Sequence, residues 1–261
     1  MVTSGTGSTV SMRTIRLLSF VAAALWAVAC SAADLTVFAA ASLSDALREI
    51  APAYTKATGD MLRFNFGASG ALARQIKEGA PADVIVSADE LSVDQLAQAG
   101  LLAAGTRRTI LANLLVVVVT ADTGAPVRTL ADLANGDVKR IAIGEPATVP
   151  VGAYTKEHLQ KLGLWAQVSA KCVPLDNVRA VLAAVEAGNA DVGFVYRTDA
   201  LISTKVRIAV TVPLGEEPKI TYPAAVLRDA KEPEAAAKFV AFLAGPEAQT
   251  VFAKYGFLPV P

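Results

Sequence analysis

The chain has 261 residues, of which 53% are hydrophobic and 18% are charged, and its formal net charge is zero. A chain this apolar is too hydrophobic to be disordered, and it is long enough for one large domain or two medium ones. The zero net charge gives no bulk signal for binding to nucleic acids or acidic membranes.

The first 33 residues have the pattern of a secretory signal peptide. Arg13 and Arg16 precede the apolar run LLSFVAAALWAVA, and small residues follow in CSAAD. We expect cleavage after Ala33 and a periplasmic mature protein. A retained anchor is one alternative, although the run is short for a membrane span. A lipid-modified Cys30 is another, which ranks lower because no leucine stands three residues before it.

Cleavage would leave Cys172 as the only cysteine. The mature protein would then have no internal disulfide, so its stability must come from its core. Loss of the two arginines of the leader would leave 22 basic against 24 acidic residues, a net charge of about −2.

Strand-like apolar runs alternate with amphipathic helical runs along the mature chain. The first three strands are expected at 35–40, 62–67 and 82–88, followed by helices at 43–57, 69–79 and 92–100. Later strands are expected at 114–120, 140–144, 190–196, 206–213 and 220–227. Later helices are expected near 129–134, from about 151, at 176–187, and twice between 232 and 256. This alternation predicts an α/β fold with mainly parallel sheets, in two halves that enclose a cleft.

Motifs for catalysis are missing from the sequence. His158 is the sole histidine and lies in a polar helical stretch, so we expect it to be solvated. Cys172 is expected to be a buried or inert thiol, and Asp83 and Asp89 are expected to serve in turns and caps. The sequence contains no G-x-S-x-G elbow, P-loop or dinucleotide fingerprint. These observations argue against an enzyme.

The ends of predicted strands instead carry small and hydroxylated residues. Ser42 and Ser69 each close a strand and open a helix, Val151 and Val178 lie in first helical turns, and Tyr196 ends a strand. A helix N-terminus presents unpaired N–H groups and partial positive charge, so it can bind an oxyanion without lysine or arginine. The alternatives are that the serines merely cap their helices and that the tyrosine is a core residue.

Several stretches together resemble the periplasmic molybdate-binding proteins of bacterial ABC transporters. The resemblance covers residues 34–259 and is carried by TVFAAASL, LARQIKEGAPADVIVSAD, VPVGAYTKEHLQKLG, DNVRAVLAAVEAG, FVYRTDA and the C-terminal YPAAVL and FVAFLAGPEAQTVFAKYGF. It implies a type II periplasmic binding fold, with two α/β domains around a central ligand cleft. Domain I would comprise 34–112 and 219–261, and domain II 113–218.

The same resemblance implies that molybdate or tungstate is bound in the cleft. The donors would be the side chains of Ser42, Ser69 and Tyr196 and the backbone N–H groups of Val151 and Val178. Molybdenum would be bound only through its oxygens, without a direct protein ligand and without a cofactor. Val151 stands where the family commonly has alanine, and NVR stands for the family's DVR.

The implied function is an extracytoplasmic solute-binding protein, expected to be monomeric, that delivers molybdate to an ABC permease in the inner membrane and binds no nucleic acid. A pocket of donors suits an anion whose oxygens only accept, and cavity size must then separate molybdate from sulfate. Two alternatives stay open: a binding protein for another tetrahedral oxyanion such as sulfate, and an exported α/β hydrolase.

Overall fold

The computed structural model describes residues 1–2, 32–122, 124–213, 215 and 218–260. Residues 3–31 of the predicted signal peptide, with Arg13, Arg16 and Cys30, lie outside the described residues. Residues Ala33–Pro261 form one unit. Within the described ranges, no helix combines the length and the hydropathy needed to cross a membrane.

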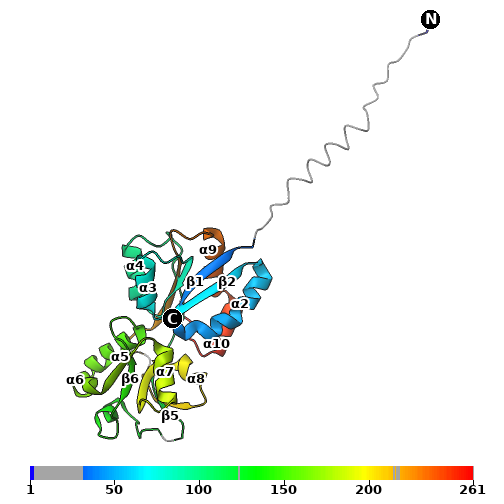
Figure 1. The fold of residues 1–261 in the computed structure, drawn as a ribbon. Coiled ribbons are helices and arrows are strands. Elements are labelled where there is room, and N and C mark those ends of the chain that lie inside the picture. Colours follow the sequence, from blue (N-terminus) through cyan, green and yellow to red (C-terminus); the bar gives the residue numbers. More distant parts are fainter. Residues whose placement is uncertain (3–31, 123, 214, 216–217, 261) are drawn as a thin grey trace. The chain divides into compact units, whose positions relative to one another are not determined.

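Two five-stranded sheets make up this unit (Figure 1). In spatial order, sheet A consists of β2 (Met61–Gly67), β1 (Asp34–Ala40), β3 (Val84–Val86), β10 (Thr221–Val226) and β4 (Arg108–Ala112). Sheet B consists of β7 (Cys172–Leu175), β6 (Ile141–Gly144), β8 (Val192–Tyr196), β5 (Leu115–Thr120) and β9 (Val206–Thr211). The chain therefore crosses from sheet A to sheet B after β4 and returns between β9 and β10. The exact domain boundaries stay predictions.

Each sheet has its own set of helices. Those that pack with sheet A are α2 (Ser44–Thr58), α3 (Ser69–Lys77), α4 (Glu90–Gln98) and α9 (Pro233–Leu243), and α10 (Pro246–Lys254) packs on α2 and α9. Those that pack with sheet B are α5 (Pro150–Lys161), α7 (Val178–Glu186) and α8 (Arg197–Leu201), and α6 (Trp165–Val168) packs on α5. Short 3-10 turns are η1 (Ala41–Leu43), η2 (Leu130–Ala134) and η3 (Ser169–Lys171). Each sheet with its helices is called half A or half B below.

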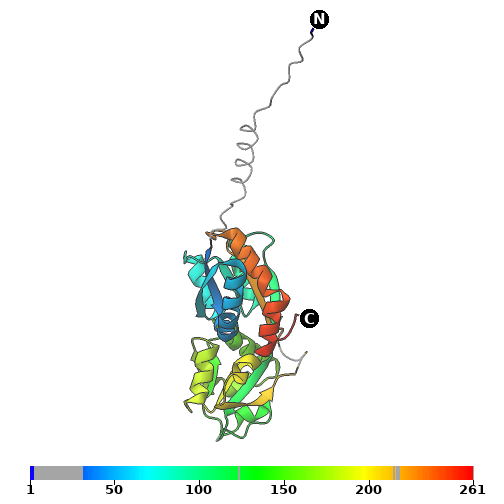
Figure 2. The same cartoon turned by 90° about the vertical axis from the view of Figure 1, so that its right-hand side faces the viewer.

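The alternation of side chains along β1 explains how sheet A is covered on both faces. Phe38 points to one face and packs in a cluster with Leu72 of α3 and Val93 of α4. Val37 and Ala39 point to the other face, in the cluster that contains Ile50 of α2 and residues of α9 and α10. The C-terminal helices α9 and α10 lie beside α2 in both views (Figures 1 and 2). Strand β1 is therefore apolar on both sides and is covered by helices on both faces of sheet A.

The expectation of mainly parallel sheets is wrong in part. The pairs β1–β2, β1–β3, β6–β7 and β6–β8 are parallel. The pairs β3–β10, β4–β10, β5–β8 and β5–β9 are antiparallel. The reason lies in β5 and β10, the strands by which the chain enters each half directly from the other. They are not preceded by a βα crossover that would make them parallel.

The predicted strands and most predicted helices are confirmed within a few residues, including the break at Gly245-Pro246. Two strands were not predicted, namely β4 and β7. Both lie at the edge of their sheets, where a strand needs fewer apolar residues and tolerates the proline of CVPL. The helix expected near 129–134 is the 3-10 turn η2, which Thr129 begins with a capping box.

Candidate functional site

One pocket lies where the carboxyl ends of β1, β2 and β8 meet the first turns of α3, α5 and α7. Its lining contains no charged side chain and few polar ones. The lining residues are Ala40, Ala41, Ser42, Gly67, Ala68, Ser69, Ala88, Val149, Pro150, Val151, Asn177, Val178 and Tyr196. The structure therefore brings all five residues singled out in the sequence to one place.

The register of sheet A places the two serines side by side. Ala40 at the end of β1 pairs with Gly67 at the end of β2, so the two following turns are neighbours. Ser42 lies in η1 directly before α2, and Ser69 is the first residue of α3. Both serines are buried. Alanine and glycine around them let the backbone of these turns approach the pocket closely.

Neither serine caps its helix, so the cap alternative is wrong for both. No side-chain cap hydrogen bond exists at the start of η1, α2 or α3. The Ser42 Oγ lies 3.1 Å from the hydroxyl of Tyr222. The Ser69 Oγ accepts the backbone N–H of Ala88 at 2.9 Å. Because that N–H can only donate, the Ser69 hydroxyl keeps its own proton for another acceptor.

Half B contributes two helix N-termini. Val151 follows Pro150, the first residue of α5, and Val178 is the first residue of α7. The first N–H groups of a helix have no acceptor within it. The Asn177 side chain accepts the N–H groups of Arg179 and Ala180, both at 3.0 Å, and so leaves that of Val178 uncapped. An asparagine just before a helical run is the signal that could have identified this cap from the sequence.

A close approach of two glycines sets the position of α5. An added Cβ on Gly152 would lie 1.9 Å from the carbonyl oxygen of Gly144, at the end of β6. Only glycine at 152 therefore lets the first turn of α5 rest on β6, which places the Val151 N–H at the pocket.

Tyr196 contributes a hydroxyl from the end of β8. The residue is 1% exposed, and its hydroxyl is without a hydrogen-bond partner among the described residues. Burial raises the pKa of this phenol well above its usual value, so it stays protonated. A buried donor that lines a pocket and has no partner in the protein is available for a ligand.

Arg179 lies next to the pocket and forms ion pairs with two carboxylates. The Arg179 guanidinium lies 2.8 Å from Asp199 in half B and 2.7 Å from Asp45 in half A, and it contacts the Ser42 carbonyl at 3.4 Å. Asp199 is fully buried, and this burial raises its pKa to about 6 although Arg179 opposes the shift. Arg179 could not be singled out by local pattern, because its partners Asp45 and Asp199 are distant along the chain.

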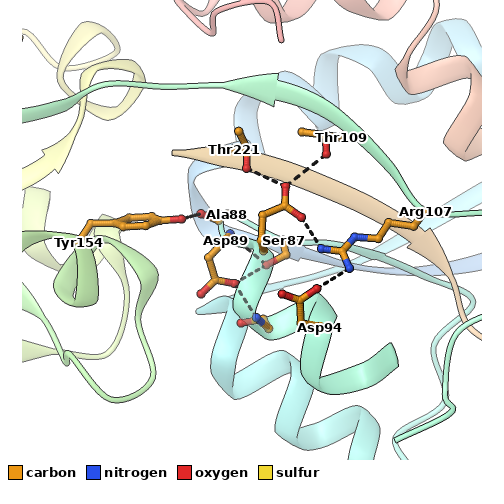
Figure 3. A network of polar contacts seen from close by, with 10 residues as sticks. Ser87, Ala88, Asp89, Asp94, Arg107, Thr109, Tyr154 and Thr221 are labelled. Atoms are coloured by element: carbon orange, nitrogen blue, oxygen red, sulfur yellow. Dashed lines mark hydrogen bonds and ion pairs between the residues drawn. The ribbon is translucent and has the colours of Figure 1, made fainter. Parts of the chain in front are cut away.

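Ala88, which donates to Ser69, also receives a contact from half B. The Tyr154 hydroxyl of α5 donates to the Ala88 carbonyl at 3.4 Å (Figure 3). A second backbone contact joins the halves nearby, where the N–H of Gly70 donates to the carbonyl of Thr148 at 3.2 Å. The two halves therefore meet around the pocket through neutral hydrogen bonds as well as through Arg179.

A polar network fixes the loop that carries Ala88. Asp89 caps α4 by accepting the Ser92 N–H at 3.1 Å, which confirms its expected cap role (Figure 3). The next residue, Glu90, accepts the Thr221 hydroxyl of β10 at 2.7 Å and pairs with Arg107. These bonds tie the start of α4 to sheet A.

The remaining sequence candidates lie outside the pocket. Asp83 accepts backbone N–H groups of Thr36 and Lys231, so it has the expected structural role. Burial raises the pKa of the half-buried Cys172 thiol to about 11, which makes it inert at neutral pH, as expected. His158 is 2% exposed, so the expectation of a solvated histidine is wrong. Its helix, α5, is covered by α6 as well as by sheet B.

Among the residues the structure describes, no group of three or more His, Cys, Asp and Glu side chains is placed to bind a metal ion. The hydroxyls of Ser42, Ser69 and Tyr196 and the N–H groups of two helix N-termini lie at the pocket. Such a donor set suits a small anion whose oxygens accept hydrogen bonds from several sides.

Comparisons with known proteins agree with this chemistry. The family described as "Bacterial extracellular solute-binding protein" matches residues 35–258. The molybdate-binding protein ModA of Escherichia coli (strain K12) is 42% identical over 229 residues, which cover 85% of this chain and 88% of that protein. The putative ABC transporter substrate-binding lipoprotein YvgL of Bacillus subtilis (strain 168) is 42% identical over 224 residues, 85% of each chain.

A solved structure shares the architecture. The periplasmic molybdate-binding protein of Azotobacter vinelandii superposes with a TM-score of 0.78 at 28% identity, over 87% of this chain and 99% of that one. The predicted type II periplasmic binding fold is thereby confirmed. The chain belongs to the bacterial extracellular solute-binding proteins, in the group that includes the molybdate-binding proteins.

Proposed function

We propose that this protein captures molybdate outside the cytoplasm and delivers it to the membrane permease of an ABC transporter. The pocket carries the proposal, because Ser42, Ser69, Val151, Val178 and Tyr196 all line it and no charged side chain does. The relatives named as molybdate-binding proteins support it. The role is binding rather than catalysis, by a monomer that needs no cofactor.

The donor set explains the choice of ligand. Molybdate is a tetrahedral dianion whose oxygens only accept hydrogen bonds. Three hydroxyls and two helix N-termini supply donors from both halves, and the helix ends add a compensating field. A hydroxyl proton of hydrogen phosphate would meet no acceptor and would cost binding energy. Tungstate has the same charge and shape as molybdate, so we propose that it binds as well, whereas the smaller sulfate would leave its bonds long.

Binding is proposed to bring the halves together by hinge motion at the two crossings between the sheets. The contacts that join the halves at the pocket are then those of the closed form. They are the Arg179–Asp45 ion pair and the hydrogen bonds from Gly70 to Thr148 and from Tyr154 to Ala88. The closed form would be the one that docks on the permease.

The proposed location is the periplasm, after export and cleavage behind Ala33. The family is described as extracellular, and one relative is named a lipoprotein. Mass spectrometry of the exported protein tests this. A mass that matches a chain beginning at Asp34 supports release. A mass that includes a lipid adduct on Cys30 contradicts release and supports anchoring.

Titration calorimetry of the mature protein with molybdate, tungstate, sulfate and phosphate tests the function. We expect tight binding of the first two and weak or undetectable binding of the others. Replacing Ser42 by alanine should cost about 1.5–3 kcal/mol of molybdate binding, because a hydrogen bond to a charged group is lost. Ser44→Ala is the matched control, since Ser44 lies two residues away and does not line the pocket. Comparable sulfate binding would favour the alternative of a sulfate-binding protein.

A further inference from the structure

Behind Ser42 lies a row of hydrogen bonds made by residues that do not line the pocket. The Ser42 Oγ lies 3.1 Å from the hydroxyl of Tyr222 on β10. The same phenol oxygen accepts an N–H of the Asn113 side-chain amide at 3.1 Å. Asn113 lies in the crossing from β4 to β5, and its backbone N–H donates to Ile220 in the opposite crossing. Ser42, Asn113 and Tyr222 are all buried.

The orientation of the Asn113 amide follows from its surroundings. The backbone N–H of Leu114 donates to the Asn113 Oδ1 at 2.9 Å. A backbone N–H can only donate, so this contact distinguishes the amide oxygen from the amide nitrogen. The nitrogen therefore donates both to Tyr222 and to the Thr198 hydroxyl, which lies 3.0 Å away in half B.

This orientation decides where the Tyr222 proton goes. The phenol oxygen already receives a proton from Asn113, and burial raises the pKa of Tyr222, so the phenol keeps its own proton. Among the described residues, the Ser42 Oγ is the acceptor within reach of that proton. The Ser42 oxygen then accepts the Tyr222 proton, and the Ser42 proton is left to point into the pocket. Ser69 reaches the same state because Ala88 donates to it.

We propose that Asn113 and Tyr222 are positioning residues that force the Ser42 hydroxyl to donate into the pocket, which makes them determinants of oxyanion selectivity. The inference rests on the proposed function. A serine free to rotate could accept a proton from a protonated oxyanion such as hydrogen phosphate. A serine whose oxygen accepts the Tyr222 proton directs its own proton at the ligand, so it favours a fully deprotonated ligand whose oxygens all accept. The hydrogen bonds from Asn113 to Tyr222 and from Tyr222 to Ser42 also polarise one another, which strengthens each of them.

The test is a double-mutant cycle measured by titration calorimetry with molybdate. Tyr222→Phe should weaken binding about threefold to tenfold, because the orienting bond to Ser42 is lost. Ser42→Ala should weaken it roughly 10- to 150-fold. If Tyr222 acts through Ser42, the double variant binds no more weakly than Ser42→Ala alone. Effects that multiply would overturn the proposal.

Two further variants separate positioning from a structural role. Tyr54→Phe is the matched control, since the Tyr54 hydroxyl is also buried but bonds to Asp60 at 3.2 Å outside the pocket. It should leave binding unchanged, and only Tyr222→Phe should narrow the preference for molybdate over hydrogen phosphate. Asn113→Asp turns the donor into an acceptor, which draws the Tyr222 proton away and leaves Ser42 donating to Tyr222. Molybdate binding should then fall further than in Tyr222→Phe, and unchanged binding would overturn the proposal.

The outcomes for the two proposals differ. Absence of molybdate binding by the unaltered protein would contradict the proposed function and the positioning role together. Molybdate binding with independent, multiplying effects of Ser42→Ala and Tyr222→Phe would contradict the positioning role alone.

Discussion

Replacing Gly70 by alanine should weaken molybdate binding without harming the ligand-free fold. Gly70 lies in the first turn of α3, beside Ser69, and meets the Thr148 segment of half B. A Cβ at this position would lie 2.7 Å from the Thr148 carbonyl oxygen and 3.2 Å from its carbonyl carbon. The added Cβ would meet backbone atoms of Thr148, and a Cβ cannot be rotated away, so no change of side-chain rotamer relieves the clash.

The free-energy cost of this clash can be approximated. Relieving an overpacked contact typically costs about 1–3 kcal/mol, and the Gly70–Thr148 hydrogen bond would lengthen as well. If half B is displaced in the ligand-free protein, this cost falls only on the closed form. The dissociation constant for molybdate should then rise by roughly 5- to 150-fold. Alanine is a better helix former than glycine by about 0.5–1 kcal/mol, so the ligand-free protein should be as stable as before or slightly more stable.

The assay combines calorimetric titration with thermal unfolding in the absence of ligand. Gly136→Ala is the control, because a Cβ at Gly136 would meet nothing within 4 Å and its φ is not in the left-handed region. An unchanged affinity in Gly70→Ala would refute the role of this contact. A loss of ligand-free stability as large as the loss of affinity would show instead that α3 itself was damaged.

Three other substitutions test the surroundings of the pocket. Asp45→Asn removes the partly exposed ion pair to Arg179 and should raise the molybdate dissociation rate in stopped-flow measurements by at most about fivefold, less at high salt. Gly152→Ala places a Cβ against the Gly144 carbonyl and should lower both molybdate affinity and, by about 1–3 kcal/mol, the free energy of unfolding in urea. Burial of Asp199 disfavours its ionised form, with a pKa of about 6, so protonation below that pH favours the fold. The stability of the unaltered protein relative to Asp199→Asn should therefore increase by about 1 kcal/mol from pH 7 to pH 5; no change would contradict the assignment.

The pocket residues could be predicted because each lies at the end of an apolar strand or in the first turn of a helix. Ser42 and Ser69 occupy matching turns, and the parallel register of β1 and β2 makes those turns neighbours. Local patterning therefore carried most of the information about them. The same holds for Val151, Val178 and Tyr196 in half B.

The residues behind the pocket could not be predicted in this way. Tyr222 is 180 residues from its partner Ser42 and comes from a strand that returns after the chain has built the whole of half B. Asn113 lies in a short crossing with no pattern of its own. The burial of His158 was missed because the polar sequence of α5 does not reveal that α6 folds back over it. The positions of Tyr222 and Asn113 and the burial of His158 all depend on contacts between segments that are distant along the chain.

Binding of molybdate in the neutral pocket of donors is tested most directly by a crystal structure of the mature protein with molybdate, with anomalous diffraction recorded at the molybdenum absorption edge. We expect one strong anomalous peak in the pocket, within hydrogen-bonding reach, through its oxygens, of the Ser42, Ser69 and Tyr196 hydroxyls. An empty pocket, or molybdenum bound elsewhere on the protein, would contradict the claim.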